Sequence, residues 1–113
     1  MDADLQAYID GIAPEFRPLF DRLHGIMLRA HPDAAFVYAY NMPTYRMGKR
    51  RLHLAVWRHG ISIYGWRRDN DGGFSERHPE LLSGKSTLRI RPEDAAGIPD
   101  GEFEDLLGGA FDH

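Results

Sequence analysis

Residues 34–91 alternate between apolar and polar side chains in short runs, which is the pattern of β-strands that have one buried face. Five strands are predicted, with turn-forming residues between them: residues 34–40, 44–47, 51–58, 61–66 and 85–91. Between the third and fourth strands, His59-Gly60 predicts a two-residue hairpin turn in which the glycine takes a positive φ. The stretch therefore predicts one mainly antiparallel sheet.

Side chains of a strand point alternately to opposite faces, so each predicted strand divides into two sets. One set is aliphatic and predicts the face that packs on the core: Ala35, Val37, Ala39, Leu52, Leu54, Val56, Ile61, Ile63, Leu88 and Ile90. The other set is mostly aromatic and basic: Phe36, Tyr38, Tyr40, His53, Trp57, Tyr64, Trp66, Lys85, Thr87, Arg89 and Arg91. This second set is too aromatic for a face that only meets solvent and too charged for a dry core. It is the most informative feature of the sequence.

Helical periodicity flanks the strands on both sides. Asp2 predicts the N-cap of a first helix, and Pro14 or Pro18 opens a longer second helix. Asp100 predicts the cap of a short final helix. The apolar stripes of the N-terminal helices need an apolar surface, which the aliphatic sheet face supplies. We therefore expect residues 1–113 to form a single α+β domain, a two-layer sandwich with a mainly antiparallel sheet of about five strands, N-terminal helices on one face and a short C-terminal helix.

The charges are distributed unevenly along the 113 residues, whose net charge is −3. Residues 46–91 contain 11 basic and 4 acidic side chains, a net +7, whereas residues 92–113 contain 7 acidic side chains and no Lys or Arg, a net −7. Such asymmetry indicates an anionic ligand or partner. The alternative, which the sequence favours slightly, is that the acidic segment folds over the basic strands and pairs their arginines with Glu102, Glu104 and Asp105.

The composition excludes several kinds of site. Because the chain contains no cysteine, it has no disulfide, thiolate metal site or cysteine nucleophile. No run approaches the roughly 20 apolar residues that span a membrane, so we expect a cytoplasmic protein without a membrane partner. Gly84-Lys85-Ser86 lacks the context of a phosphate-binding loop, and the histidines lack metal-ligand spacing. No catalytic constellation is apparent, so we expect that the protein is not an enzyme.

The aromatic and basic face is the remaining candidate site. Lys85, Arg89 and Arg91 occupy alternate positions of one predicted strand, and Tyr40, Tyr64 and Trp66 supply flat rings nearby. Sheets that bind single-stranded nucleic acid combine these features, and a pocket for a small anion uses the same chemistry on a smaller scale. The sequence pI near 6.0 argues against nucleic acid, because typical binding domains have a pI above about 9. A covered second core therefore ranks first, a small-anion pocket second and nucleic acid third.

Two motifs stand out in the sheet region: Tyr40-Asn41-Met42-Pro43-Thr44-Tyr45-Arg46 and Ser83-Gly84-Lys85-Ser86-Thr87-Leu88-Arg89-Ile90. They resemble the YdhG-like domains, a bacterial family of unknown function, and the resemblance covers nearly the whole chain. It implies a cytosolic two-layer α+β domain with no established enzymatic activity. Some members are described as frataxin-like iron chaperones that hold iron weakly through carboxylates, which implies iron as a candidate cofactor. The candidate iron ligands here are Glu102, Glu104 and Asp105.

The expected function is that of a non-enzymatic binding domain for a small anionic ligand. Both motifs fall on strands that contribute to one region, and the expected ligand-binding residues are Tyr40, Pro43, Tyr45, Lys85, Thr87 and Arg89. One alternative is an iron chaperone that binds iron through surface carboxylates. Another is a protein-interaction domain, either a monomer or a homodimer that associates through the aromatic face.

Overall fold

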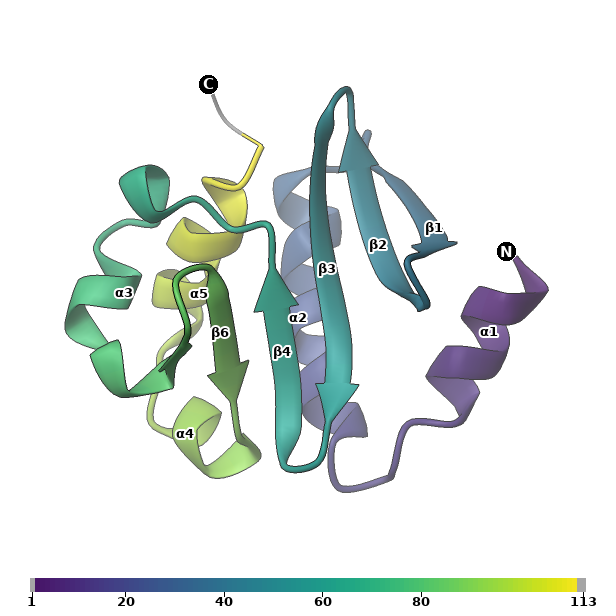
Figure 1. Ribbon diagram of the computed structural model, residues 1–113, viewed down its shortest axis with the longest axis horizontal. Coiled ribbons are helices and arrows are strands. Elements are labelled where there is room, and N and C mark those ends of the chain that lie inside the picture. Colours follow the sequence, from purple (N-terminus) through teal and green to yellow (C-terminus); the bar gives the residue numbers. More distant parts are fainter. Residues whose placement is uncertain (1, 112–113) are drawn as a thin grey trace.

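A six-stranded antiparallel sheet forms one layer of the protein, and α-helices form the other (Figure 1). The computed structural model describes residues 2–111. The strands, in the order in which they lie side by side, are β1 (Ala35–Ala39), β2 (Met42–Met47), β3 (Arg50–Trp57), β4 (Gly60–Tyr64), β6 (Thr87–Ile90) and β5 (Leu82–Ser83). The helices are α1 (Ala3–Asp10), α2 (Arg17–Ala30), α3 (Phe74–Arg77), α4 (Pro92–Ala96) and α5 (Asp100–Gly108), with 3-10 turns at Arg68–Asn70 and Pro79–Leu81. The predicted α+β sandwich is confirmed, with six strands in place of about five.

Local signals set the ends of the first two helices. The Asp2 carboxylate accepts a hydrogen bond from the backbone N–H of Asp4 (2.9 Å) and so caps α1. Pro18 lies in the first turn of α2, so Pro18 rather than Pro14 opens that helix. Pro92 likewise begins α4. Asp100 is the first residue of α5 and Pro99 is its N-cap, so the predicted cap at Asp100 is wrong. None of the helices in the described part of the chain combines the length and the apolar character needed to cross a membrane.

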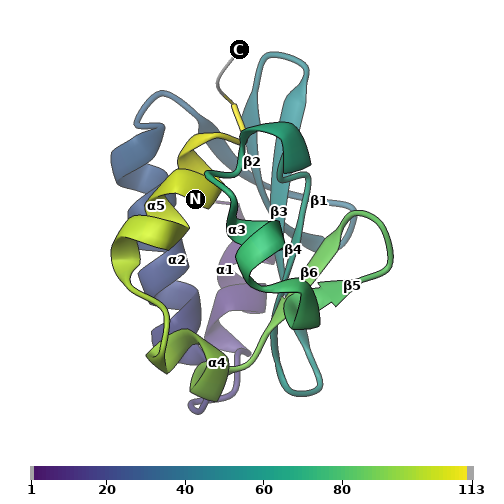
Figure 2. The same ribbon diagram turned by 90° about the vertical axis from the view of Figure 1, so that its left-hand side faces the viewer.

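Helices α1, α2 and α5 lie on the same side of the sheet (Figures 1 and 2). Six strand residues that face them on β3, β4 and β6 are aliphatic and fully buried: Leu52, Leu54, Ile61, Ile63, Leu88 and Ile90. These six belong to the predicted aliphatic face. Burying one such side chain contributes about 1.5–3 kcal/mol, so this contact decides which side of the sheet the helices occupy.

The predicted faces of β1 are wrong. Phe36 pairs with Tyr45, and Tyr45 pairs with Leu52, so Phe36 and Tyr38 lie on the helix-facing side. The ring of His24 on α2 contacts both Phe36 and Tyr45 there. Both sets of β1 side chains are apolar, and the larger rings bury more area against the helices. The opposite face therefore receives the small side chains Ala35, Val37 and Ala39.

Four residues predicted on the aromatic and basic face lie outside the strands, and the first of them, Tyr40, is in the β1–β2 turn. Gly65, with a φ of +89°, ends β4, and Trp66 beyond it packs into the core. Lys85 lies in the turn between β5 and β6, and Arg91 follows β6 at the start of α4. The sheet is thus shorter at this end than the sequence pattern predicts.

Gly60 has a different role from the one predicted. It pairs with Trp57, so the hairpin turn is Arg58-His59, and Gly60 does not have a positive φ. A Cβ at this position would collide with the backbone carbonyl of Ile90 on β6. The glycine therefore permits close approach of two strands rather than a special turn.

Arg22 joins the long helix α2 to the C-terminal segment. Its guanidinium pairs with Asp100 (Nε–Oδ1 2.6 Å) and donates hydrogen bonds to the carbonyls of Ala95 (2.9 Å) and Ile98 (2.6 Å). It also lies 4.8 Å from the ring centre of Phe103. One side chain thus fixes the positions of both α4 and α5 against α2.

We expect Arg22→Ala to lower the free energy of unfolding by about 2–4 kcal/mol, because two carbonyls and a carboxylate lose a charged donor. Urea unfolding followed by circular dichroism measures this loss. The matched control is Arg29→Ala, an exposed arginine on the same helix, for which we expect a change within about 0.5 kcal/mol. Equal losses in the two variants would contradict the role given to Arg22.

Candidate functional site

The face of the sheet opposite the helices, which we call the open face, is not covered by any helix of the described residues (Figure 2). Most of its side chains are small, hydroxyl-bearing, aromatic or basic, and none is acidic. The strand register assigns to it Ala35, Val37, Ala39, Met42, Thr44, Arg46, Arg51, His53, Ala55, Trp57, Ser62, Tyr64, Ser83, Thr87 and Arg89. This composition suits contact with an anion.

The whole sheet lacks acidic residues. Residues 35–64 and 82–90, which comprise the strands and the turns within them, contain no Asp or Glu and seven basic residues: Arg46, Lys49, Arg50, Arg51, Arg58, Lys85 and Arg89. Helix α5 of the acidic segment packs against α2 in the helical layer instead. For residues 92–111, the interpretation that this segment covers the basic strands is therefore wrong, and Asp112 lies outside the described residues.

The three candidate iron ligands on α5 lie in that helical layer. Hydrogen bonds from His78 (Nε2–Oε1 2.8 Å) and Arg77 (Nε–Oε1 3.0 Å) lower the pKa of Glu102. Glu104 and Asp105 line a separate shallow depression. Within residues 2–111, no group of three or more His, Cys, Asp or Glu side chains is arranged to hold a metal ion. The three carboxylates are therefore not brought together.

The six predicted ligand residues separate into two groups. Four lie on the open face or at its edge, namely Tyr40, Thr87, Arg89 and Lys85. Pro43 and Tyr45 are buried on the helix-facing side, and Tyr45 is only 1% exposed. Burial raises the pKa of Tyr45, whose neutral hydroxyl lies 2.6 Å from His24 Nδ1. Neither Pro43 nor Tyr45 is accessible to a ligand on the open face.

Arg89 reaches across the sheet from β6 to β3. Its guanidinium carbon lies 5.0 Å from the ring centre of Trp57, although β4 runs between the two strands. The β4 residue directly beside Arg89 is Ser62, so the arginine side chain passes over it. Ser62 is consequently only 1% exposed, although no helix of the described residues covers this face.

Two polar groups at this contact have no hydrogen-bond partner among the described residues: the Ser62 hydroxyl and the Trp57 indole N–H. A buried polar group without a partner costs about 1–3 kcal/mol. The Arg89 guanidinium also forms no ion pair with any described carboxylate. Indole and guanidinium N–H groups can only donate, so the cluster needs an acceptor. An oxyanion supplies one.

A pocket of about 270 Å³ opens beside this cluster and is lined by Trp57, Arg89 and Arg91. Glu80 and Asp94 also line it, and the Asp94 carboxylate accepts a hydrogen bond from the backbone N–H of Arg91 (3.1 Å). A larger depression of about 420 Å³ at the β3–β4 turn also reaches Arg91. Among the described residues, no unpartnered buried donor lines that larger depression, so the smaller pocket is the better candidate.

His53 forms a second polar cluster on the open face. Its Nδ1 lies 2.7 Å from Thr44 Oγ1, which is also within hydrogen-bond distance of the carbonyls of Ala39 (3.2 Å) and Met42 (3.1 Å). Because carbonyls only accept, all partners are satisfied when Thr44 donates to a carbonyl and His53 Nδ1–H donates to Thr44. Burial and then the charge of Arg51 lower the pKa of His53. Neutral His53 therefore presents the lone pair of Nε2 as an acceptor.

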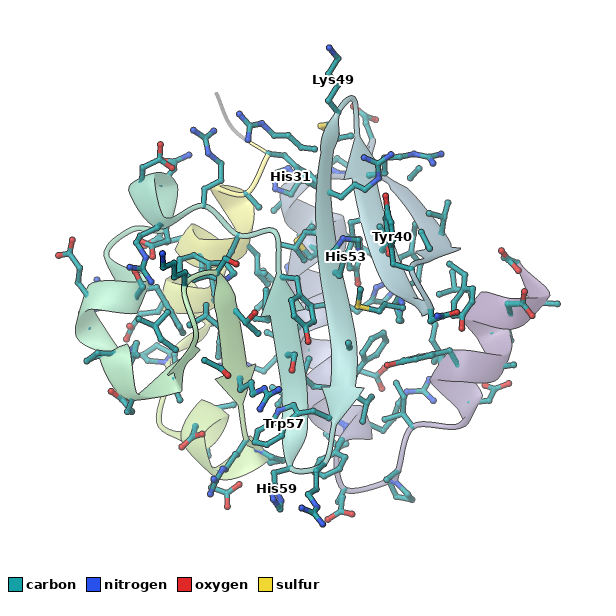
Figure 3. The ribbon with its side chains drawn as sticks, viewed as in Figure 1. His31, Tyr40, Lys49, His53, Trp57 and His59 are labelled. Carbon is teal, nitrogen blue, oxygen red and sulfur yellow. The ribbon has the colours of Figure 1, made fainter. Side chains whose placement is uncertain are left out.

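Tyr40 stands beside His53 at the β1–β2 turn (Figure 3). The two rings are perpendicular, with their centres 5.5 Å apart, and Tyr40 is 67% exposed. Tyr40 and Asn41 both have positive φ values, 55° and 61°, which is the geometry of a tight two-residue hairpin turn. The turn holds an aromatic ring out over the open face.

Ser62 and Thr44 were not identified as site residues by the sequence pattern. Ser62 lies between Ile61 and Ile63, and this alternation is a signal that it faces the open side. Its burial has no such signal, because it depends on an arginine that arrives from another strand. The role of Thr44 likewise depends on its register with His53.

We expect His53 to titrate below the ordinary value of 6.5 and to exist as the Nδ1–H tautomer when neutral. Long-range ¹H–¹⁵N NMR of the ring measures both properties. Since folding favours the neutral ring, His53 contributes stability that is fully present above pH 6.5 and is lost as the pH falls towards its folded pKa. Thr44→Val removes the acceptor for Nδ1–H and should give a mixture of tautomers. An unchanged tautomer in that variant would contradict the assignment.

The function of the open face has to be inferred from its own chemistry. Arg89, Trp57 and Ser62 provide donors without partners, and His53 provides an acceptor at a second position. Comparison with known proteins found no matching family model, no matching curated protein and no matching solved structure.

Proposed function

We propose that this protein is a cytosolic, non-enzymatic binding domain that holds a small oxyanion, a carboxylate or a phosphate group, at Arg89 and Trp57 on the open face. The observation that carries the proposal is the stacked Arg89–Trp57 contact with two buried donors that lack partners. An anion in the adjoining pocket, which Trp57 and Arg89 line, can accept hydrogen bonds from the indole N–H and the guanidinium, and this removes the cost of leaving the indole unsatisfied. Membership of the YdhG-like family is proposed alongside this function.

The chemistry of the cluster favours an anion over other small ligands. A guanidinium presents several N–H donors in a planar fork that matches a carboxylate or a phosphate. The pocket of about 270 Å³ is close to the lower end of the usual small-ligand range, roughly 300–1,000 Å³. It therefore suits a compact group. The alternative, in which carboxylates of α5 bind iron, has less support because His78 and Arg77 already form hydrogen bonds with the Glu102 carboxylate.

Titration of the ¹⁵N-labelled protein with sodium phosphate, at constant ionic strength maintained with sodium chloride, tests the proposal. We expect saturable shifts of the Trp57 Nε1–H and Arg89 Nε–H signals, with a Kd in the millimolar range, which corresponds to about −4 kcal/mol. Arg89→Ala should raise this Kd at least about tenfold, since it removes a charged donor. The matched control is Arg46→Ala, an exposed arginine near the other end of the open face, which should leave the Kd unchanged. Shifts that do not saturate, or equal effects of the two variants, would refute the site.

A second substitution separates the indole N–H from the aromatic ring. Trp57→Phe retains a ring under Arg89 but removes the donor, so phosphate binding should weaken about 3- to 10-fold, the range of one neutral hydrogen bond. The indole signal that disappears from the spectrum of this variant belongs to Trp57, and the indole signal that remains belongs to Trp66. If phosphate binds Trp57→Phe as tightly as the parent protein, the indole N–H does not contact the anion.

A further inference from the structure

We propose that the oxyanion bound at Arg89 is a phosphate of a single-stranded nucleic acid that lies along β3 across the open face. This inference rests on the proposed function and specifies the class of ligand. Figure 3 shows the relevant arrangement, with Tyr40, His53 and Trp57 along the face, Lys49 at one end and His59 at the other. Stacking of bases and pairing of phosphates are common to DNA and RNA, and both are available here.

Aromatic rings occupy the middle of the open face. Tyr40 and His53 are in contact, and the neighbour of His53 across the β3–β4 ladder is Tyr64. Trp57 lies four residues further along β3. Every nucleobase has a flat π-face, so rings spaced along a strand bind single-stranded nucleic acid with little sequence preference. Bases in a duplex are already stacked and cannot use such rings.

Basic side chains lie at both ends of this row of rings. Arg46, Lys49 and Arg51 surround the β2–β3 hairpin, and Arg58 and Arg89 lie towards the other end of β3. None of these five forms an ion pair with another described side chain. The eight residues of β3 span about 26 Å, enough for several nucleotides. The face can therefore contact phosphates on either side of the stacked bases.

The negative net charge of the chain does not oppose this arrangement. Acidic residues are absent from the sheet and its turns, while α5, with much of the acidic segment, packs on α2 behind the sheet. Glu80 and Asp94 line the pocket beside Arg89, but the strands themselves present only basic and uncharged side chains to a polyanion. The charges of α5 on the far side are weakened by distance and by salt screening over about 8–10 Å. The charge of a face, rather than of the whole chain, decides such an encounter.

His53 adds an acceptor to a face that otherwise presents mainly donors. Its Nε2, the ring nitrogen that Thr44 does not contact, can accept a hydrogen bond from an exocyclic amino group or a ring N–H of a base. Phosphates have no N–H groups, so this contact is specific to the base. Bound single strands are thus offered donors for their phosphates, rings for their bases and one acceptor for a base edge.

Fluorescence anisotropy with labelled single strands of deoxythymidine and of uridine tests the inference. Each strand is about eight nucleotides long, which lies within the range of roughly 4–16 nucleotides that single-strand binding domains contact. We expect binding that weakens with salt, with log Kobs falling by about 0.7 per phosphate neutralised for each tenfold rise in salt. Arg89→Ala should reduce that slope by about 0.7. A duplex of the same length should bind at least about fivefold more weakly, since its bases cannot stack on the rings.

The decisive variant is Tyr40→Asn, because asparagine tolerates the positive φ at this turn while removing the ring. It should weaken oligonucleotide binding about fivefold or more and leave phosphate binding at Arg89 unchanged. Tyr40→Phe should retain the parent affinity. The control is Leu28→Ala, an exposed apolar residue on helix α2, which should change neither affinity.

The outcomes separate the two proposals. If phosphate binds at Arg89 but the oligonucleotides bind no more tightly than phosphate does, the nucleic-acid inference is wrong and the proposed function stands. If neither binds, both are wrong. If the duplex binds as well as the single strands, or Tyr40→Asn has no effect, stacking is absent and the inference fails. A dimer that light scattering detects in the parent protein and not in Tyr40→Asn would identify a second copy as the occupant instead.

Discussion

Within residues 2–111, helices pack on only one face of the six-stranded sheet, so each central strand has to place an apolar side chain at every second position and a water-compatible one between them. On β3 this requirement gives fully buried Leu52 and Leu54 on one side and His53 on the other. The hydrophobic contact between the aliphatic face and the helices thereby determines which residues the open face receives. A slip of one residue in the register of β3 would bury His53 and expose both leucines.

The sequence predicts the parts of the fold that depend on local chemistry. The cap at Asp2, the proline at the start of α2 and the aliphatic alternation of β3 and β4 each have a signal within a few residues. Such signals do not orient β1, because Phe36 and its neighbour Val37 are both apolar and either could face the helices. The deciding contact is with His24 on α2, which lies far away in the sequence.

In the candidate site, too, some features have a local signal in the sequence and others depend on contacts between distant residues. Arg89 and Thr87 were predicted from alternation along one strand, and both lie on the open face. The stacking of Arg89 on Trp57 requires that β6 lie next to β4 and that the arginine then cross β4, which no spacing in the sequence indicates. The burial of Ser62 follows from that crossing. Pro43 and Tyr45 belong to a strand whose faces could only be assigned once its pairing with β1 and β3 was known.

The strands carry no acidic residues and helix α5 carries several, so positive and negative charges are separated across the molecule and give it an electric dipole moment. Its positive end is the open face and its negative end lies among the helices, where Glu102, Glu104 and Asp105 are found. A dipole experiences a torque in the field of a charged body, so a polyanion in dilute salt turns the protein towards it before contact. Random collisions are thereby replaced by collisions that are already oriented, and the association rate rises. The same torque disappears as salt is added, so the speed of encounter depends on ionic strength even when the final contacts do not change.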